Sequence, residues 1–294
     1  MKNEAGKVKA SKKARLLKAR QIFAQALKEA RGADQLPVYL QINIMDMHDW
    51  EDVDPASIDQ DLINSHEAHY LQAVREASRS VGQFVADLAA LPGWQNTFFV
   101  ITSDHGEGLN NHPAVPKSYR HGNLLYESQA RVPLILVNPA DPKLKGHVIT
   151  SLTSLLDLAP TLLDYLKIPA PPAFMGTSLP GLIGLSEPAP DLPEFVVTET
   201  NHGKADKIAV YSAEWKYIEK RDQWEGVNEY ELQPRGPNEN GVLTDKIALH
   251  PGQAAKMRSF LLHWERRHPP KSRGVPAQKL TPLELKQLKS LGYL

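Results

Sequence analysis

Apolar residues along the first two thirds of the chain alternate between two patterns, one typical of buried strands and one typical of amphipathic helices. Short, β-branched runs predict buried strands at Val38–Met45, Thr97–Thr102 and Leu134–Val137. Helical spacing of apolar residues predicts helices at Lys12–Arg31 and Ser65–Leu91. Strands that alternate with long helices favour an α/β fold with a central sheet that is parallel in its core.

The pattern changes after a further predicted helix at Ser154–Leu166. The proline-rich stretch Pro169–Pro193 is too interrupted for regular structure and is predicted to be a crossing loop. Helices are then expected at Gly252–Arg267 and Thr281–Leu291. Four short strands are predicted between the loop and these helices: Phe195–Thr200, Ile208–Tyr211, Trp215–Glu219 and Glu229–Leu232. These elements predict a catalytic α/β domain at residues 1–190 and a small α+β subdomain with an antiparallel sheet and a terminal helix at 191–294.

Composition narrows the possible classes of protein and of binding partner. The 294 residues include 34 Lys and Arg and 34 Asp and Glu, and this balance favours neither nucleic acid nor an anionic membrane as a partner. No apolar run is long enough for a membrane-spanning helix, and no apolar stretch near Met1 is typical of a secretory signal. Cysteine is absent, which excludes disulfides and thiolate ligands and leaves the compartment open.

The strand at Thr97–Thr102 runs directly into Ser103-Asp104-His105-Gly106-Glu107. Ligands gather at the carboxyl ends of the strands in α/β sheets, so this position favours a functional site. Asp104 and His105 could place a carboxylate oxygen and an imidazole nitrogen on one divalent cation, with Glu107 orienting them. The alternative is a capped turn with a solvated histidine.

Two further segments carry residues that could belong to the same site. Asp46 and His48 come at the end of the first predicted strand, and His121-Gly122 follows shortly after the Asp104 motif. A histidine near a metal can hold an oxyanion or protonate a leaving oxygen. Each residue taken alone could equally be an ordinary polar loop residue.

The order of these segments resembles the sulfatase family of the alkaline-phosphatase superfamily, over nearly the whole chain. The matching segments are Asp46-Met47-His48, the long helix, Ser103-Asp104-His105-Gly106-Glu107, His121 within HGNLLYESQARVPLIL, Asp157–Ile183, the strand AEWKYIEK and the ending LKQLKSLGYL. The resemblance implies the C-terminal half of an alkaline-phosphatase-like sandwich with a mostly parallel central sheet. It also implies a hydrolase of sulfuric esters, with a small sulfate ester or a sulfated glycan as substrate.

The resemblance also implies roles for the candidate residues. Asp104 and His105 would hold one divalent cation, which is usually calcium in the family, while His48 and His121 would contact the sulfate or leaving oxygen. Asp46 and Glu107 remain further candidates. Many members have Asn in place of His105 and Lys in place of His121, and imidazole also suits manganese or zinc.

The family's nucleophile has no counterpart in this sequence. Members carry a C/S-x-P-x-R segment that matures to formylglycine, together with two acidic metal ligands on the first strand. This chain has no cysteine and no Ser-x-Pro-x-Arg. We therefore expect an incomplete chain that needs an N-terminal half and is inactive alone. A phosphodiesterase or phosphonate monoester hydrolase of the same superfamily, and a non-catalytic remnant or partner subunit, stay open as alternatives.

Overall fold

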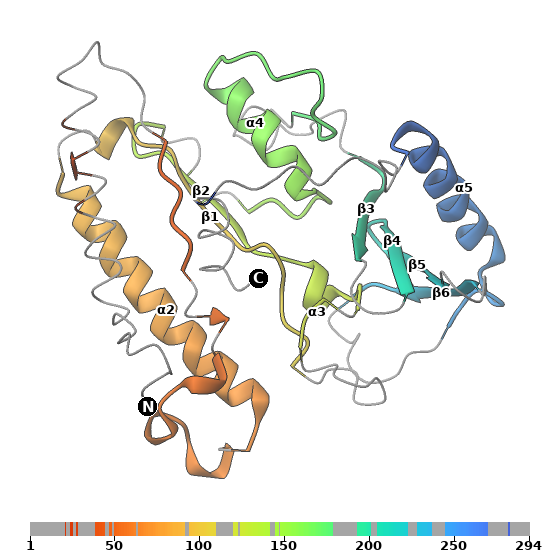
Figure 1. Ribbon diagram of the computed structural model, residues 1–294, viewed down its shortest axis with the longest axis horizontal. Coiled ribbons are helices and arrows are strands. Elements are labelled where there is room, and N and C mark those ends of the chain that lie inside the picture. Colours follow the sequence, from red (N-terminus) through yellow and green to blue (C-terminus); the bar gives the residue numbers. More distant parts are fainter. Residues whose placement is uncertain are drawn as a thin grey trace. The chain divides into compact units, whose positions relative to one another are not determined.

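The computed structural model divides the chain into two compact units, residues 1–97 with 273–294, and residues 98–272 (Figure 1). The described residues are 21, 24, 25, 28, 39–44, 47–48, 50–62, 64–91, 94–109, 120–122, 124–141, 145–146, 148–178, 193–200, 205–222, 228–236, 245–269 and 282. The predicted domain boundary near residue 190 stays a prediction.

The long helix of the first unit, α2, spans His66–Ala89, as the hydrophobic pattern predicts. It begins at Ser65, whose side chain accepts a hydrogen bond from the Ala68 backbone N–H and so caps the exposed end of the helix. Three short 3-10 turns precede it, η2 at Trp50–Asp52, η3 at Pro55–Ser57 and η4 at Gln60–Leu62. Trp50 of η2 is buried and meets the ring of Tyr70 edge-on, which fastens η2 to α2.

The prediction of a strand at Val38–Met45 is wrong for its described part, since residues 39–44 form no strand. Exposure still alternates with a period of two, and the side chains of Tyr39, Gln41 and Asn43 are hydrogen-bonded in a row. The segment therefore has the side-chain pattern of a strand. A strand also needs a neighbour that supplies ladder hydrogen bonds, and none pairs with it among the described residues. The described positions Gln21, Ala24, Gln25 and Lys28 of the predicted first helix are helical, and the rest of that segment lies outside the described residues.

The second unit begins with strands β1, Phe99–Thr102, and β2, Leu134–Val137, where the sequence predicts them. The 3-10 turn η5, Trp94–Asn96, precedes β1 in the chain. The two strands pair antiparallel, with Phe99 opposite Val137. All strand pairs in the described part of the chain are antiparallel, so the mostly parallel central sheet stays a prediction.

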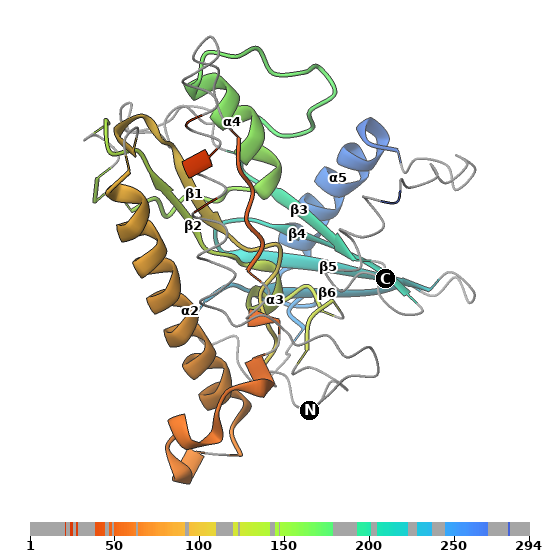
Figure 2. The same ribbon diagram turned by 60° about the vertical axis from the view of Figure 1, so that its left-hand side comes forward.

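The four predicted C-terminal strands form one antiparallel sheet in chain order (Figure 2). Their bounds are β3, Val196–Thr200; β4, Ala205–Tyr211; β5, Trp215–Asp222; and β6, Asn228–Pro234. The helix α5, Pro251–Arg267, packs on β4 and β5. This arrangement confirms the predicted antiparallel α+β elements. No helix in the described parts of the chain is long and apolar enough to cross a membrane.

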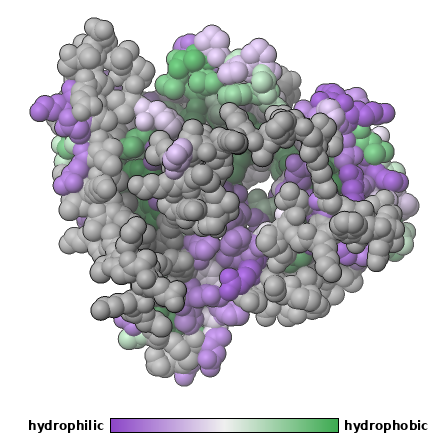
Figure 3. Space-filling view, viewed as in Figure 1, coloured by the Kyte–Doolittle hydropathy of each residue, from purple (hydrophilic) through white to green (hydrophobic). Residues whose placement is uncertain are grey.

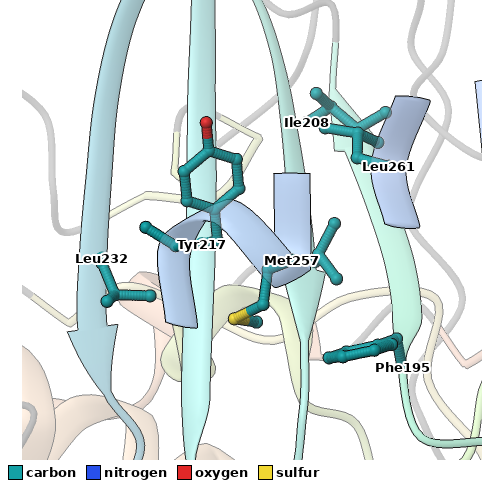
Figure 4. Packing of buried hydrophobic residues seen from close by; sticks show 8 residues of the cluster. Phe195, Ile208, Tyr217, Leu232, Met257 and Leu261 are labelled. Atoms are coloured by element: carbon teal, nitrogen blue, oxygen red, sulfur yellow. The ribbon is translucent and has the colours of Figure 1, made fainter. Parts of the chain in front are cut away.

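Both faces of this sheet carry buried residues. Neighbouring residues of β4 face opposite ways and contribute to two different cores. Ile208 and Val210 join a core with Tyr217 and with residues of α5, among them Met257 and Leu261 (Figure 4). Val210 lies directly opposite Tyr217 in the register, and Tyr217 lies opposite Leu232, so the three side chains share one face.

The opposite face of the sheet is covered by residues 124–126. Ala209, Tyr211 and Ile218 form a second core with Leu124, Leu125 and Tyr126. Burial on both faces explains why the second half of β4, Ile208–Tyr211, is continuously apolar. The second core joins the C-terminal sheet to the segment that carries the candidate His121.

The predicted helix at Ser154–Leu166 consists of the 3-10 turn η7, Leu155–Asp157, and α4, Leu158–Tyr165. Only Pro160 and Thr161 of α4 are buried, and exposed apolar side chains surround the helix at the top of Figure 3. The buried carboxylate of Asp157 accepts hydrogen bonds from the backbone N–H groups of Ser154, at 3.0 Å, and Thr177, at 2.9 Å. Hydrogen bonds to Asp157 therefore hold this helix in place more than core packing does.

Gly176 allows the backbone to pass closely over η7. A Cβ atom at this position would lie 1.9 Å from the carbonyl oxygen of Leu156. We expect Gly176→Ala to lower the free energy of unfolding by about 1–3 kcal/mol, because backbone cannot yield as a flexible side chain can. Urea denaturation measures this, with Gly252→Ala in α5 as the control, since a Cβ there meets nothing within 4 Å. Equal stabilities of the two variants would contradict the close approach.

Lys216 of β5 is fully buried, with Nζ 4.4 Å from the centre of the Tyr126 ring. Burial lowers the pKa of Lys216 from 10.5 to about 7, although Glu127 and Glu231 oppose the shift. Between these two values the unfolded chain binds more protons than the folded one, so stability should rise with pH. Relative to Lys216→Met, the wild-type protein should gain at most about 1.4 kcal/mol per pH unit above about pH 7.

Denaturation at a series of pH values measures this difference. The control is Lys220→Met, an exposed lysine of the same strand, which leaves Lys216 in place and should keep the wild-type pH dependence. Parallel curves for wild type and Lys216→Met would show that Lys216 keeps its proton in the fold.

Candidate active site

The loop after β1 carries Ser103, Asp104 and His105, and local hydrogen bonds fix its shape. The Ser103 hydroxyl donates to the His105 carbonyl at 2.6 Å, and the His105 backbone N–H donates to Asp104 Oδ1 at 3.1 Å. Thr102, the last residue of β1, donates from its hydroxyl to the Pro133 carbonyl just before β2. The loop is thereby fastened to the end of the strand pair.

The tautomer of His105 follows from its own neighbour. Nδ1 lies 2.7 Å from the Gly106 carbonyl oxygen, which can only accept, so Nδ1 carries a proton. In the neutral ring Nε2 is then an acceptor, which is the form that binds a metal ion. Nε2 lies 3.8 Å from Asp104 Oδ1. This separation is close to the roughly 3–3.5 Å expected between two ligands of one cation at bond lengths of about 2.1–2.4 Å.

His121 forms an ion pair with Glu107. Nδ1 of His121 lies 3.2 Å from Glu107 Oε2, and only 9% of the Glu107 side chain is exposed. The hydrogen bond that His121 donates to Glu107 raises the pKa of His121 above its ordinary value, although partial burial opposes the shift. The pair therefore favours an imidazolium at His121, with a positive charge close to Asp104 and His105.

The two histidine rings are stacked, with centroids 3.9 Å apart and planes inclined by 23°. Asp104, His105, Glu107 and His121 thus form one cluster although 14 positions separate Glu107 from His121. The sequence predicts that Asp104, His105, His48 and His121 converge around one pocket, and the structure brings Asp104, His105 and His121 together. Their chemical roles stay predictions.

Both loops of the cluster meet at α3, Glu127–Ala130. The Gly106 backbone N–H donates to the Gln129 carbonyl, and a Cβ at Gly106 would lie 2.0 Å from the Ser128 carbonyl oxygen. The buried amide of Gln129 accepts from the Leu124 backbone N–H and donates to the Arg120 carbonyl. Gln129 was not predicted as a site residue, because a single glutamine has no pattern that separates it from surface glutamines.

Side-chain hydrogen bonds and an ion pair fasten this region to the C-terminal sheet. The hydroxyl of Thr200 donates to the Gly122 carbonyl, and that of Tyr211 donates to the Leu125 carbonyl. The Tyr126 hydroxyl donates to Glu231 at 3.0 Å. Arg235 forms an ion pair with Glu127. The sheet thereby fixes the segment that carries His121.

Two of the predicted residues cannot be added to this cluster. His48 is an exposed turn residue in the first unit, and Asp46 lies outside the described residues. The convergence of His48 with Asp104 stays a prediction.

The cluster supplies two donors that fit a divalent cation, the Asp104 carboxylate and His105 Nε2. Glu107 is engaged with His121, and no group of three or more acidic or histidine side chains able to hold a metal ion occurs among the described residues. Calcium takes six to eight oxygen ligands, so these two residues would form only one side of such a site. An imidazolium at His121, which the pair with Glu107 favours, would suit an oxyanion beside them.

Comparisons with known proteins identify the family of the chain. A family model for sulfatases matches residues 11–168, which is more than half of the chain. An arylsulfatase from Clostridium perfringens is 31% identical over 128 residues, covering 43% of this chain and 26% of that protein. The chain spans about a quarter of the length of the curated relatives it matches.

Solved structures are similar in fold. One is of a protein in complex with its substrate D-glucosamine-2-N,6-O-disulfate, with a TM-score of 0.56 and 20% identity over 76% of this chain and 45% of that one. Another is the phosphonate monoester hydrolase of Agrobacterium radiobacter, with a TM-score of 0.57 and 20% identity over 69% of this chain and 41% of that one. The matched family model shows that this chain belongs to the sulfatase family.

Proposed function

We propose that this chain contributes one side of an active site that hydrolyses sulfuric esters. The observation that carries the proposal is the cluster of Asp104, His105 and the Glu107–His121 ion pair beside the end of β1. A sulfate ester presents oxygens that carry negative charge, and the cluster combines a cationic donor with two potential cation ligands. A small sulfate ester or a sulfated glycan is the substrate class that fits.

His121 binds a sulfate oxygen in this proposal. Its Nδ1 is engaged by Glu107, so Nε2–H is the group that can donate to a substrate oxygen. Donors placed in advance stabilise charge that develops during attack at sulfur, because they need no reorganisation at that moment. His48 is proposed as a second contact to the sulfate or to the leaving oxygen.

Asp104 and His105 are proposed to hold one divalent cation, with calcium first and manganese or zinc as alternatives. The bond from His105 Nδ1 to the Gly106 carbonyl keeps Nε2 in the form that can bind it. Such an ion, when bound, would polarise a sulfate oxygen as a Lewis acid. Asp46 is a further proposed ligand, and the remaining ligands would come from other residues.

The attacking group is proposed to come from a further N-terminal segment. The chain has no cysteine that could mature to formylglycine and no Ser-x-Pro-x-Arg. Covalent catalysis needs an activated nucleophile, and charge stabilisation alone does not replace it. A non-catalytic partner subunit remains the alternative if no such segment exists.

Hydrolysis of phosphate diesters or phosphonate monoesters is the second candidate function. The observation that favours it is the imidazole of His105 among the proposed ligands, since imidazole suits zinc and manganese well. The same cluster would then hold phosphoryl oxygens.

Binding of a sulfate ester to this chain tests the first proposal. With ring-labelled histidines, 4-nitrophenyl sulfate and calcium should shift the NMR signals of His105 and His121 and leave those of His250 and His268 in place. His121→Gln should weaken binding about 10- to 100-fold, because a hydrogen bond to a charged group is lost. His268→Gln, at the end of α5, is the control. Tighter binding of a phosphonate monoester, with manganese or zinc, would favour the second candidate.

Turnover by the isolated chain tests the missing nucleophile. Neither 4-nitrophenyl sulfate nor bis-4-nitrophenyl phosphate should be hydrolysed above background with calcium, manganese or zinc, because removal of a nucleophile usually costs several orders of magnitude in rate. A continuous absorbance assay measures this. Activity that disappears in His105→Ala would overturn the proposal of an external nucleophile and point to attack by water.

A further inference from the structure

Gln129 occupies an unusual position between the two loops of the candidate active site. It is a residue of α3 with 4% of its surface exposed, and it is hydrogen-bonded to the backbone of Gly106, Arg120 and Leu124. Its carbonyl oxygen accepts from the Gly106 N–H at 2.9 Å. Its side-chain Oε1 accepts from the Leu124 N–H at 3.1 Å, and Nε2 donates to the Arg120 carbonyl at 2.7 Å.

These bonds hold the immediate neighbours of both histidines. Gly106 follows His105, and Arg120 precedes His121. The distance of 3.9 Å between the centroids of the two rings therefore depends on two loops that are both hydrogen-bonded to Gln129. Besides the rings themselves, the Glu107–His121 ion pair is a side-chain link between the loops.

Glutamine is suited to this position because it carries a donor and an acceptor on one short amide. The Leu124 N–H requires an acceptor, and the Arg120 carbonyl requires a donor, so the partners themselves fix which side of the amide faces which loop. Glutamate would lose the donor, and methionine of similar size would lose both groups. Buried polar groups left without partners then favour a different loop position.

The frame to which Gln129 belongs is itself held in place. The start of α3 is fastened to the C-terminal sheet. Arg235 forms an ion pair with Glu127, and the Tyr126 hydroxyl donates a hydrogen bond to Glu231. A change at Gln129 should therefore move the loops rather than α3.

We propose that Gln129 is a positioning residue that sets the spacing between His105 and His121. The inference rests on the proposed function only for the catalytic role of the cluster. The spacing itself can be measured without substrate, metal or turnover, so failure of one proposal is distinguishable from failure of the other.

The test uses the whole chain with carbon-13 in the histidine rings. The wild-type protein should show nuclear Overhauser cross-peaks between the rings of His105 and His121, assigned by their loss in His105→Gln and His121→Gln. In Gln129→Met these cross-peaks should disappear, and the backbone N–H groups of Gly106 and Leu124 should exchange faster with solvent. Far-ultraviolet circular dichroism should stay unchanged.

Gln233→Met is the matched control, because Gln233 is also 4% exposed and donates its amide to Glu231. It should lower stability to a similar degree and keep the ring cross-peaks. Gln129→Glu keeps the acceptor for Leu124 and loses the donor for Arg120, so it should weaken the cross-peaks if Gln129→Met does not fold. Cross-peaks of wild-type intensity in folded Gln129→Met or Gln129→Glu would overturn the proposal, as would their loss in Gln233→Met.

Discussion

The burial of Leu124, Leu125 and Tyr126 on the C-terminal sheet is the contact on which the rest of the second unit depends. The sheet has a core with α5 on one face, and its other face would expose apolar residues of β4 and β5 without this segment. Burial of apolar surface is the main source of stability, at about 25 cal/mol per Å². The segment next to His121 is therefore as firmly placed as the core itself, and a sheet remote in sequence acts as its support.

Polar groups complete what apolar burial begins. A contact that excludes water leaves backbone groups and charged side chains without solvent, and each must find a partner within the protein. Around residues 120–130 these partners are Thr200, Tyr211, Glu231 and Arg235 from the sheet and Gln129 from α3. Such bonds are directional, whereas apolar contacts are not. They convert a stable contact into a defined position for the loops of the candidate active site.

Charge in the cluster is arranged by the same means. Glu107 is almost buried, and its carboxylate is balanced by His121, whose pKa it raises. The stacked His105 keeps a proton on Nδ1 through the Gly106 carbonyl. One histidine is thereby suited to donate to an oxyanion and the other to bind a cation, although their rings are in contact. The proposed sulfuric ester hydrolysis would need this division of roles.

The sequence by itself determined the elements that depend on local pattern. The helix at His66–Ala89, the strands β1 and β2, and the four C-terminal strands follow from periodicity, and the motif around Asp104 and His105 follows from residue order. Only the tertiary structure decided that residues 39–44 form no strand, because ladder bonds come from a neighbour that no local pattern specifies. It also decided that Glu107 pairs with His121 and that Gln129 is hydrogen-bonded to the loops of the cluster. Both depend on loops distant in sequence that meet on α3, and such meetings are set by the packing of the whole unit on its sheet.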